Sequence, residues 1–442
     1  MATVERALDL IPDGASIVSA PGCGAPTTLL AGLQHRCAGR GWSLHTGLLL
    51  GELAFSEAVR AGELDYVTWH AYGKGAEILA AGHGDHVAIR ASQVPGHLRR
   101  MRPGAAIVRV TPPDGAGNCS LGPSASYGMA ALESASVRIA EVDPRLPRTT
   151  GNSSVPFELF DATVEAGLER AEYRSTAPSE VARRIASIVL ELLPLRPTLQ
   201  LGIGAVPEFI VSCLADADLG GVRFVGMATD AMVDIFDAAI DKRPATLPPV
   251  FSPELMGTDH LLTFADGNPH VGVYTSDVAH ASHRLALLDR FVSVNSAVEI
   301  DLLGQVNVEH IGARRVSSIG GSLDFVEAAM HSEGGMRILA LPSTSSRGEH
   351  SKIVPRLTVP VSAPSTAVDY VVTEYGSTRL RGLTDRARAE ALIAIAHPAH
   401  RRDLASTLGG GTRQPVPPPA ADAPALHSDR SQDRALANRV ED

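Results

Sequence analysis

A short strand, a glycine-rich loop and a helix occur twice, about half a chain apart. The segments GASIVSAPGCGAPTTLLAGL (14–33) and RPTLQLGIGAVPEFIVSCL (196–214) each join an apolar run, a turn with Gly and Pro, and apolar residues at helical spacing. Strands that alternate with helices are typical of α/β folds with parallel sheets. The repeat therefore predicts two α/β domains of related plan.

The domain boundary falls in EYRSTAPSEVARR (172–184), where Ser179 is suited to cap the helix that follows. A chain of 442 residues is long enough for two cores. We expect an N-terminal domain over residues 1–175, a C-terminal domain over 176–405, and a disordered Gly-, Pro- and Ala-rich tail over 406–442. Continuous apolar runs predict further strands, buried on both faces, at 105–111, 136–142, 290–294, 337–342 and 370–375.

Charge and cysteine content exclude several classes of function. The 39 Lys and Arg residues against 49 Asp and Glu give a net charge of −10, which argues against a nucleic-acid partner. Four separate cysteines suggest neither a disulfide framework nor a zinc site, so a reducing cytoplasm fits best. The chain has no secretory signal and no apolar run long enough to span a membrane, which predicts a cytoplasmic protein without a membrane partner.

Three glycine-containing turns are candidate ligand loops. GCGAP and GIGAVP lie between a strand and a helix, where backbone N–H groups can hold a phosphate, but neither matches a dinucleotide or Walker fingerprint and each can equally be a tight turn. In IGGSLDF (319–325), adjacent glycines can present N–H groups to an oxyanion. There Asp324 is better read as a first-turn residue that complements the helix dipole.

Other reactive side chains give weak signals. Cys119, in TPPDGAGNCSLG, is a conceivable nucleophile but has no nearby His and is better interpreted as a small packed residue. His270, His280 and His283 lie close together in sequence at a spacing that matches no common metal-ligand set, so no metal site is expected.

The chain resembles the acetyl-CoA hydrolase/transferase family, the class I CoA-transferases that include 4-hydroxybutyrate CoA-transferase. The resemblance covers about residues 5–403 and is carried by ordered blocks. These are VTPPDGAGNCSLG, IAEVDPRLPRTTGNS, LQLGIGAVPEFI, VSVNSAVEIDLLGQVNVEHIG, SIGGSLDF, ILALPSTSSRGEHSKIVP and VVTEYGSTRLRGLTDRARAEALIAIAHP.

The resemblance implies two related α/β domains with parallel-rich sheets, an active site at their interface, and CoA bound mostly by the C-terminal domain. It also implies an enzyme that takes a coenzyme A thioester as substrate, binds no permanent cofactor, and forms homo-oligomers. In this family a glutamate attacks an acyl-CoA and passes through a glutamyl-CoA thioester. The loop containing Gly202, Gly204, Val206 and Pro207 would lie beside CoA, and the turn at Gly320 and Gly321 would supply oxyanion and CoA-facing backbone groups.

One stretch departs from the family pattern. VRFVGMATDAMVDIF (222–236) reads as a buried strand, a turn and a helix, and its Met227, Asp230 and Asp234 match a family motif written approximately His-Thr-Glu-Met-x-x-Asp-Gly-x-x-Asp. The family glutamate then falls on Gly226, which cannot attack a thioester. A register shift would place Asp230 in the slot, and Glu299 and Glu309 are weaker candidates.

Three hypotheses follow. The favoured one is transfer or hydrolysis of an acyl group without the glutamyl-CoA intermediate, with water, an amine or an alcohol attacking in the space beside Gly226. The second is a conventional carboxylate CoA-transferase that uses another acid. The third is a catalytically silent CoA-binding or partner protein.

Overall fold

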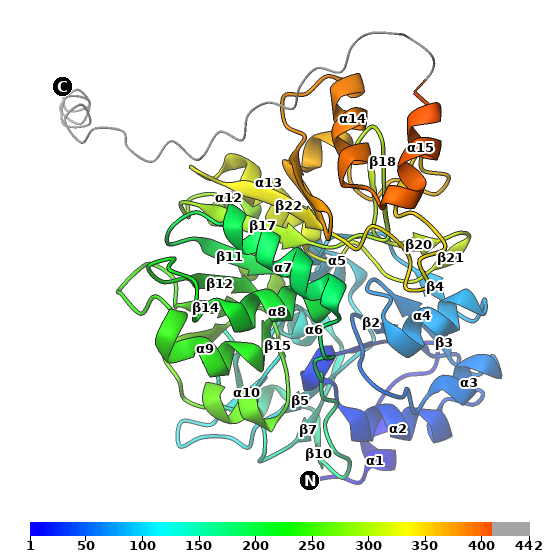
Figure 1. The fold of residues 1–442 in the computed structure, drawn as a ribbon. Coiled ribbons are helices and arrows are strands. Elements are labelled where there is room, and N and C mark those ends of the chain that lie inside the picture. Colours follow the sequence, from blue (N-terminus) through cyan, green and yellow to red (C-terminus); the bar gives the residue numbers. More distant parts are fainter. Residues whose placement is uncertain (409–442) are drawn as a thin grey trace, which may run out of the picture.

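Two sheets built largely of parallel strands organise the chain in the computed structural model, which describes residues 1–408 (Figure 1). The first sheet is formed by the blue and cyan part of the chain, and the second by the green to orange part. The expected disorder of the tail falls on residues 409–442 and so lies outside the described residues.

The first sheet has the strand order β10-β7-β5-β1-β2-β3-β4, and every neighbouring pair is parallel. All residues of β5 are buried, as the continuous apolar run predicted. The strands are β1 Ser16–Ser19, β2 Ser43–Thr46, β3 Asp65–Thr68, β4 Asp85–His86, β5 Ala105–Val110, β7 Val137–Val142 and β10 Ala162–Glu165.

The second sheet has the order β25-β24-β22-β17-β11-β12-β14-β16-β8 and is parallel except for the β24–β25 pair. Without the outer β25 and β8, its strands run in the same chain order as those of the first sheet, so the predicted relationship between the two halves is confirmed. The strands are β11 Thr198–Leu201, β12 Arg223–Gly226, β14 Val250–Ser252, β16 Val271–Val273, β17 Phe291–Asn295, β22 Met336–Ala340, β24 Tyr370–Thr373, β25 Gly376–Arg379 and β8 Thr150–Gly151.

Helices flank both sheets, and the side chain of Ser179 caps α7 by accepting from the Ala182 amide, as expected. In the first half they are α1 Val4–Leu8, α2 Thr27–Arg36, α3 Ser56–Arg60, α4 Gly73–Ala80, α5 Val94–Met101 and α6 Gly128–Ser134. In the second half they are α7 Glu180–Leu192, α8 Ala205–Cys213, α9 Ala231–Ala239, α10 Asp259–Ala265, α11 Ser276–Ala279, α12 Ser282–Leu285, α13 Ser322–His331, α14 Asp385–Ile395 and α15 Pro398–Ser406. Single 3₁₀ turns are η1 Gly22–Gly24, η2 Ala91–Gln93, η3 Phe157–Leu159 and η4 Ser365–Ala367.

Short ladders complete the fold. They pair β6 Asn118–Ser120 with β9 Ser154–Pro156, β13 Ala228–Thr229 with β15 Leu255–Met256, β18 Glu299–Asp301 with β19 Val306–Asn307 and β23 Ile353–Val354, and β20 His310–Ile311 with β21 Arg314–Arg315. The β13–β15 pair continues the line of β12 and β14 beyond the second sheet.

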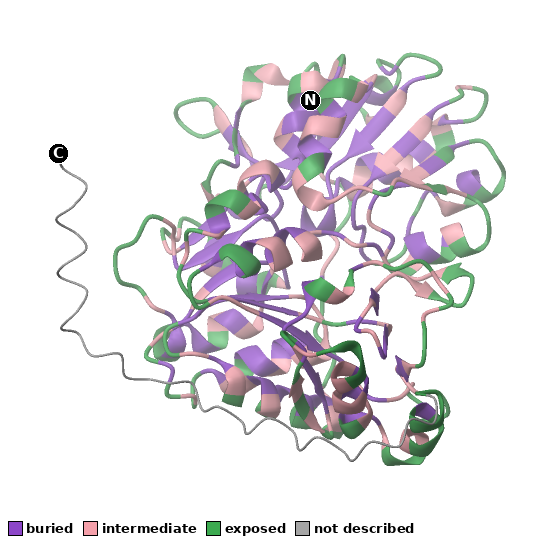
Figure 2. Cartoon of the chain, turned by 90° about the horizontal axis from the view of Figure 1, so that it is seen from above, coloured by how far each residue is buried: buried purple, intermediate pink, exposed green. Residues whose placement is uncertain are grey.

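The two halves share their packing. One buried cluster contains Val18 and Val108 of the first sheet together with Leu199 and Phe224 of the second. The first half also supplies β8, which pairs with β16 at the edge of the second sheet. Figure 2 shows the buried residues concentrated in the strands and the exposed ones on the outer loops and helix faces. No helix in residues 1–408 is both long and apolar enough to cross a membrane.

Candidate active site

A small cavity lies where the carboxyl ends of strands from the two sheets meet. In parallel α/β sheets this is the edge at which ligands bind. Gly47 and His70 come directly after β2 and β3 of the first sheet, and Met227 and Glu254 follow β12 and β14 of the second. The cavity is lined by Gly47, Leu48, Trp69, His70, Ile89, Ala91, Val94, Ser126, Tyr127, Met227, Pro253, Glu254, Ser276, His280, Gly320 and Gly321.

The turn at Gly320 and Gly321 forms one wall of this cavity, directly before α13. Gly320 has a φ of +53°, a conformation that favours glycine. A Cβ at Gly320 would lie 3.2 Å from the ring of His70, and one at Gly321 would clash with the ring of His280. Among the described residues, none accepts a hydrogen bond from either glycine amide. Two N–H groups at a helix N-terminus are therefore free of protein acceptors, which is compatible with the expected oxyanion role.

The two cavity histidines are neutral. Burial lowers the pKa of both His70 and His280 to about 4. His280 Nδ1 is buried and has no hydrogen-bond partner within the described part of the chain. At neutral pH these rings are hydrogen-bonding groups without charge.

Glu254 is the one carboxylic acid among the described residues that line the cavity. Its residue is 8 % exposed, and its Oε2 atom is buried without a hydrogen-bond partner in the described structure. Burial raises the pKa of the Glu254 carboxyl to about 7. A strongly perturbed acid in a cleft is a candidate for catalysis, and the sequence analysis did not identify this one.

The GCGAP turn of the first half leaves space for the Glu254 carboxylate. Gly22 has a φ of +57°, and a Cβ on it would lie 2.8 Å from Glu254 Oε2. The GCGAP turn thus has a packing role at the site. Cys23 is buried beside it, and burial raises the pKa of its thiol to about 11.

The structure places Gly226 close to the cavity but not in its wall. Gly226 ends β12 with a φ of +101°, and a Cβ there would lie 3.4 Å from Gln200 Cγ and 3.7 Å from Phe325. The predicted strand, turn and helix at 222–236 are present as β12, β13 and α9. The neighbouring Met227 lines the cavity.

Asp230 and Asp234 have partners outside the cavity. The Asp230 carboxylate accepts from the amides of Thr258 (3.0 Å) and Leu261 (3.2 Å), at the start of α10. Asp234 Oδ1 lies 2.9 Å from His260 Nε2. Asp230 thus caps a helix, a structural use of a carboxylate.

The predicted CoA loop lies beside the cavity. Gly202 and Gly204 come between β11 and α8, and a Cβ on either would meet nothing within 4 Å. Val206 and Pro207 are in the first turn of α8. Ile203, between the two glycines, packs against the buried cluster that contains Leu48. Met227 packs against the same cluster. The loop therefore offers open backbone next to the acid-bearing wall.

Other candidates are engaged elsewhere. Asp324 lies in the first turn of α13, as expected, and accepts from the amide and hydroxyl of Ser92 at 3.1 and 2.8 Å. Cys119 is buried in β6, and burial raises the pKa of its thiol to about 11. Glu299 accepts from Asn307 at 3.4 Å.

Two further expectations concern side chains away from the cavity. Glu309 is held in an ion pair by Arg315. Neither His270 nor His283 lines the cavity. In the part of the chain that the structure describes, no cluster of His, Cys, Asp and Glu is suited to a metal ion.

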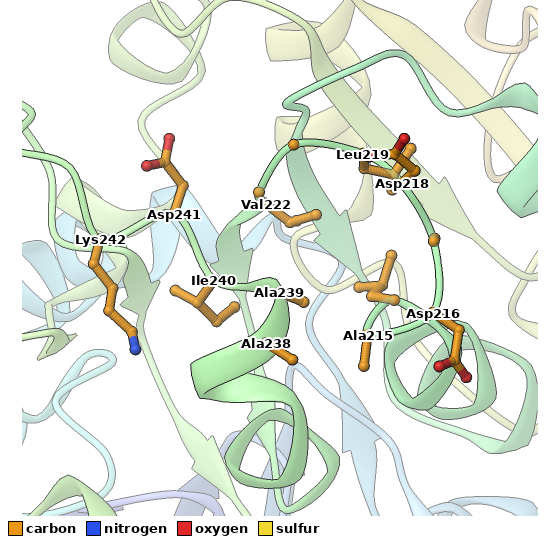
Figure 3. Close-up of a pocket in the computed structure, with 14 residues that line it drawn as sticks. Ala215, Asp216, Asp218, Leu219, Val222, Ala238, Ala239, Ile240, Asp241 and Lys242 are labelled. Atoms are coloured by element: carbon orange, nitrogen blue, oxygen red, sulfur yellow. The ribbon is translucent and has the colours of Figure 1, made fainter.

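A larger hollow lies at the opposite ends of the strands. Figure 3 shows Asp216, Asp218, Asp241 and Lys242 around it, on the loops that follow α8 and α9. Its Val222 directly precedes β12, so the hollow is at the amino end of the sheet. Parallel sheets bind ligands at the other end, which makes the small cavity the better candidate.

Comparison with known proteins finds similar sequences and a similar solved structure. Residues 257–408 match the acetyl-CoA hydrolase/transferase C-terminal domain. The chain is 33% identical to the 4-hydroxybutyrate coenzyme A transferase of Clostridium kluyveri, over 91% of this chain and 96% of that protein. It is 35% identical to the butyryl-CoA:acetate CoA-transferase of Anaerostipes caccae, over 78% and 80%. Its fold is similar to the crystal structure of RipA from Yersinia pestis, with a TM-score of 0.84 and 25% identity over 92% of this chain and 96% of that one.

Proposed function

Because the chain belongs to the acetyl-CoA hydrolase/transferase family, we propose that it moves the acyl group or the CoA of an acyl-CoA thioester in the cavity between its two sheets. Its relatives support CoA-transferase or hydrolase chemistry with a CoA thioester as substrate. We further propose that the reaction takes place in this cavity, with the Gly320–Gly321 turn and Glu254 taking part.

The Gly320–Gly321 turn is the observation that carries the proposal. Both glycines line the cavity at the N-terminus of α13, and neither amide has an acceptor in the described structure. Donors held in this way stabilise the negative charge that develops on a thioester oxygen during attack, and removing one typically costs about 10²-fold or more in rate. A turn used only for packing would not require free amides beside a buried acid.

The wall chemistry favours small acyl groups without a second charge. Trp69, Ile89 and Val94 provide apolar surface, and none of the described lining residues is Lys or Arg. The neutral His70 and His280 supply no positive charge to offset a distal carboxylate. We therefore expect monocarboxylic acyl groups, such as the butyryl and acetyl groups in the name of the Anaerostipes caccae relative, rather than succinyl.

The CoA portion is proposed to lie along the open loop after β11. A Cβ on Gly202 or Gly204 would meet nothing within 4 Å, although the Gly204 amide donates to Glu208 Oε1 at 3.0 Å. Ile203 packs against the cluster that contains Leu48 of the cavity wall. A helix N-terminus beside this loop suits a phosphate or pantetheine carbonyl. No permanently bound cofactor is needed for this chemistry. We further propose that the chain forms a homo-oligomer, as the family resemblance implies.

Glu254 changes the balance between the mechanistic alternatives. The absence of an acid at Gly226 predicted direct attack by water, an amine or an alcohol. A buried carboxylate with one oxygen free of hydrogen bonds in the described structure favours a route through an acid, with a second carboxylate as acceptor and water as the slower alternative. A silent CoA-binding protein would have no use for a buried acid with a partnerless oxygen.

The test is turnover with a defined panel of thioesters. The full chain is incubated with acetyl-, butyryl-, 4-hydroxybutyryl- or succinyl-CoA and isotopically labelled acetate, and new thioesters and free CoA are separated by chromatography. We expect label in acetyl-CoA with the monocarboxylic donors and much less with succinyl-CoA. CoA binding by calorimetry without turnover of any donor would instead identify a binding protein.

A further inference from the structure

Glu254 lies at an irregularity in the pairing of β12 and β14, in the segment opposite Gly226 and Met227. β12 and β14 pair in parallel up to Val225 and Phe251, and the pairing resumes at Ala228 and Leu255. Two residues lie between these pairs on the first strand and three on the second. An extra residue of this kind bends a strand and redirects a side chain, and such features are common next to active sites.

The extra residue occurs in the sequence Ser-Pro-Glu at 252–254. The Ser252 hydroxyl accepts from the Glu254 amide at 3.2 Å and donates to the Glu254 carbonyl at 2.7 Å, which closes the turn locally. The Ala228 amide donates to the same carbonyl at 3.3 Å, and Ser126 donates its amide to the Pro253 carbonyl at 3.2 Å. Segments from both halves of the chain therefore hold Glu254 one strand away from Gly226.

Burial of the Glu254 carboxylate is expected to lower the free energy of unfolding. A buried carboxylate oxygen without a partner loses its hydration and gains nothing in return. Glu254 Oε2 is in this state, and no described Lys or Arg lines the cavity to compensate it. Gly22 accommodates the oxygen only because it lacks a side chain. Proteins retain such unsatisfied acids mainly where chemistry requires them.

The remaining acids near this region are already engaged. Asp230 is held by two amides of α10, and Glu299 accepts from the side chain of Asn307. Neither lines the cavity. Glu208 also has a buried oxygen without a partner, but its other oxygen accepts from Tyr173 and Gly204 and the residue does not line the cavity. Among the described acids, only Glu254 combines a buried, partnerless oxygen with a place in the cavity wall that contains Gly320 and Gly321.

We propose that Glu254 is the nucleophile of this chain, so that the attacking acid comes from the end of β14 instead of the end of β12. The proposal rests on the acyl-CoA function proposed above. It assigns a catalytic role to a residue outside the strand, turn and helix in which the family motif has its acid.

The chemistry balances without a further reactant. A Glu254 carboxylate oxygen bonds to the thioester carbonyl carbon, the C–S bond breaks, and CoA leaves as the thiolate, which gives a mixed anhydride. The thiolate then attacks the glutamyl carbonyl carbon and the acyl group departs as its carboxylate, leaving a glutamyl-CoA thioester. An acceptor carboxylate reverses these steps, and water would instead release CoA and regenerate the Glu254 carboxylate.

Reductive trapping tests the assignment. The wild-type chain is incubated with butyryl-CoA without acceptor, treated with borohydride and digested, and the peptides are mapped by mass spectrometry. We expect the peptide containing Glu254 to lose one oxygen and gain two hydrogens, as a thioester reduced to an alcohol requires. Glu254→Gln should show no such change and should turn over butyryl-CoA with acetate about 10³-fold or more slowly. Glu299→Gln, the matched control, should be trapped at Glu254 like the wild type.

The outcomes separate this proposal from the function on which it rests. Turnover by the wild type without reduction at Glu254, or turnover by Glu254→Gln within tenfold of wild type, would overturn the nucleophile and leave the acyl-CoA function standing. No turnover of any thioester by the wild type would overturn both. Glu254→Asp keeps a shorter carboxylate and should be trapped at residue 254 with reduced turnover. If either variant fails to fold in a thermal melt, the wild-type peptide map still decides.

Discussion

The two sheets have the same strand order, yet their corresponding ends contribute different chemistry to the cavity. After β2 and β3, the first half presents Gly47 and Trp69, which provide space and an apolar wall. After β12 and β14, the second half presents Met227 and Glu254. The common strand order therefore brings the strand ends of both sheets to one cavity. The extra residue between β14 and β15 is part of the segment that contains Glu254, so only the second sheet contributes an acid.

Moving the acid between neighbouring strands should have the largest effect. Gly226→Glu in the Glu254→Gln background is expected to remain about 10³-fold or more below wild type, since the acid would start from a different strand in a strained conformation. Its φ of +101° should also cost about 1–3 kcal/mol in unfolding free energy. Gly226→Ala in the same background is the control, because it adds the strain without the acid. Recovery of activity specific to the glutamate would show that either strand end can supply the nucleophile.

Closing the oxyanion turn should have the next largest effect. Gly321→Ala would drive a Cβ into His280 and displace the turn, so kcat with butyryl-CoA and acetate is expected to fall about 10²-fold. Gly115→Ala is a matched control, because a Cβ at Gly115 meets nothing within 4 Å and its φ is not positive. Equal rates for the two variants would remove the turn from the mechanism.

The pH dependence of activity should report the buried acid. A nucleophilic carboxylate must be ionised, so kcat/KM should rise with pH to a plateau, with a midpoint near the Glu254 pKa of about 7, and fall about tenfold for each pH unit below it. A profile flat between pH 5.5 and 8, on the order of one pH unit either side of that value, would contradict an acid with a raised pKa.

The same group should affect stability with a defined sign. The folded state holds the Glu254 proton more tightly than the unfolded state, so the wild type should lose free energy of unfolding as pH rises from about 4.5 to about 7. Relative to Glu254→Gln, the loss is expected to be on the order of 1–3 kcal/mol. The histidines with lowered pKa values are common to both proteins and cancel in this difference.

Removing the Asp230 cap should have the smallest effect on chemistry. Asp230→Ala leaves the Thr258 and Leu261 amides without their acceptor and is expected to lower unfolding free energy by about 1 kcal/mol, with kcat changed only a few-fold. Asp230→Asn retains one acceptor oxygen and should be milder. A hundredfold loss of kcat in Asp230→Asn without loss of stability would return the catalytic role to Asp230.

The sequence predicted features that depend on local pattern. The strand, loop and helix at 14–33 and 196–214, the strands at 105–111 and 370–375, and the Ser179 cap are all present because each is specified by neighbouring residues. The free amides of Gly320 and Gly321 could also be anticipated from two adjacent glycines before a helix.

Glu254 could not be recognised in the same way. Its position depends on the register between β12 and β14 and on the space left by Gly22, more than 200 residues away in the chain. His70 and His280 likewise meet at the Gly320–Gly321 turn from different halves of the protein. The local signal available was Pro-Glu directly after a buried strand, which has no significance until the opposing wall is known.

A structure of the chain with butyryl-CoA bound tests the central claim most directly. We expect a carboxylate oxygen of Glu254 within about 3–3.5 Å of the thioester carbonyl carbon, and the carbonyl oxygen facing the amides of Gly320 and Gly321. A thioester whose carbonyl carbon lies against Asp230, Glu299 or no acid at all, with Glu254 out of reach, would contradict the account.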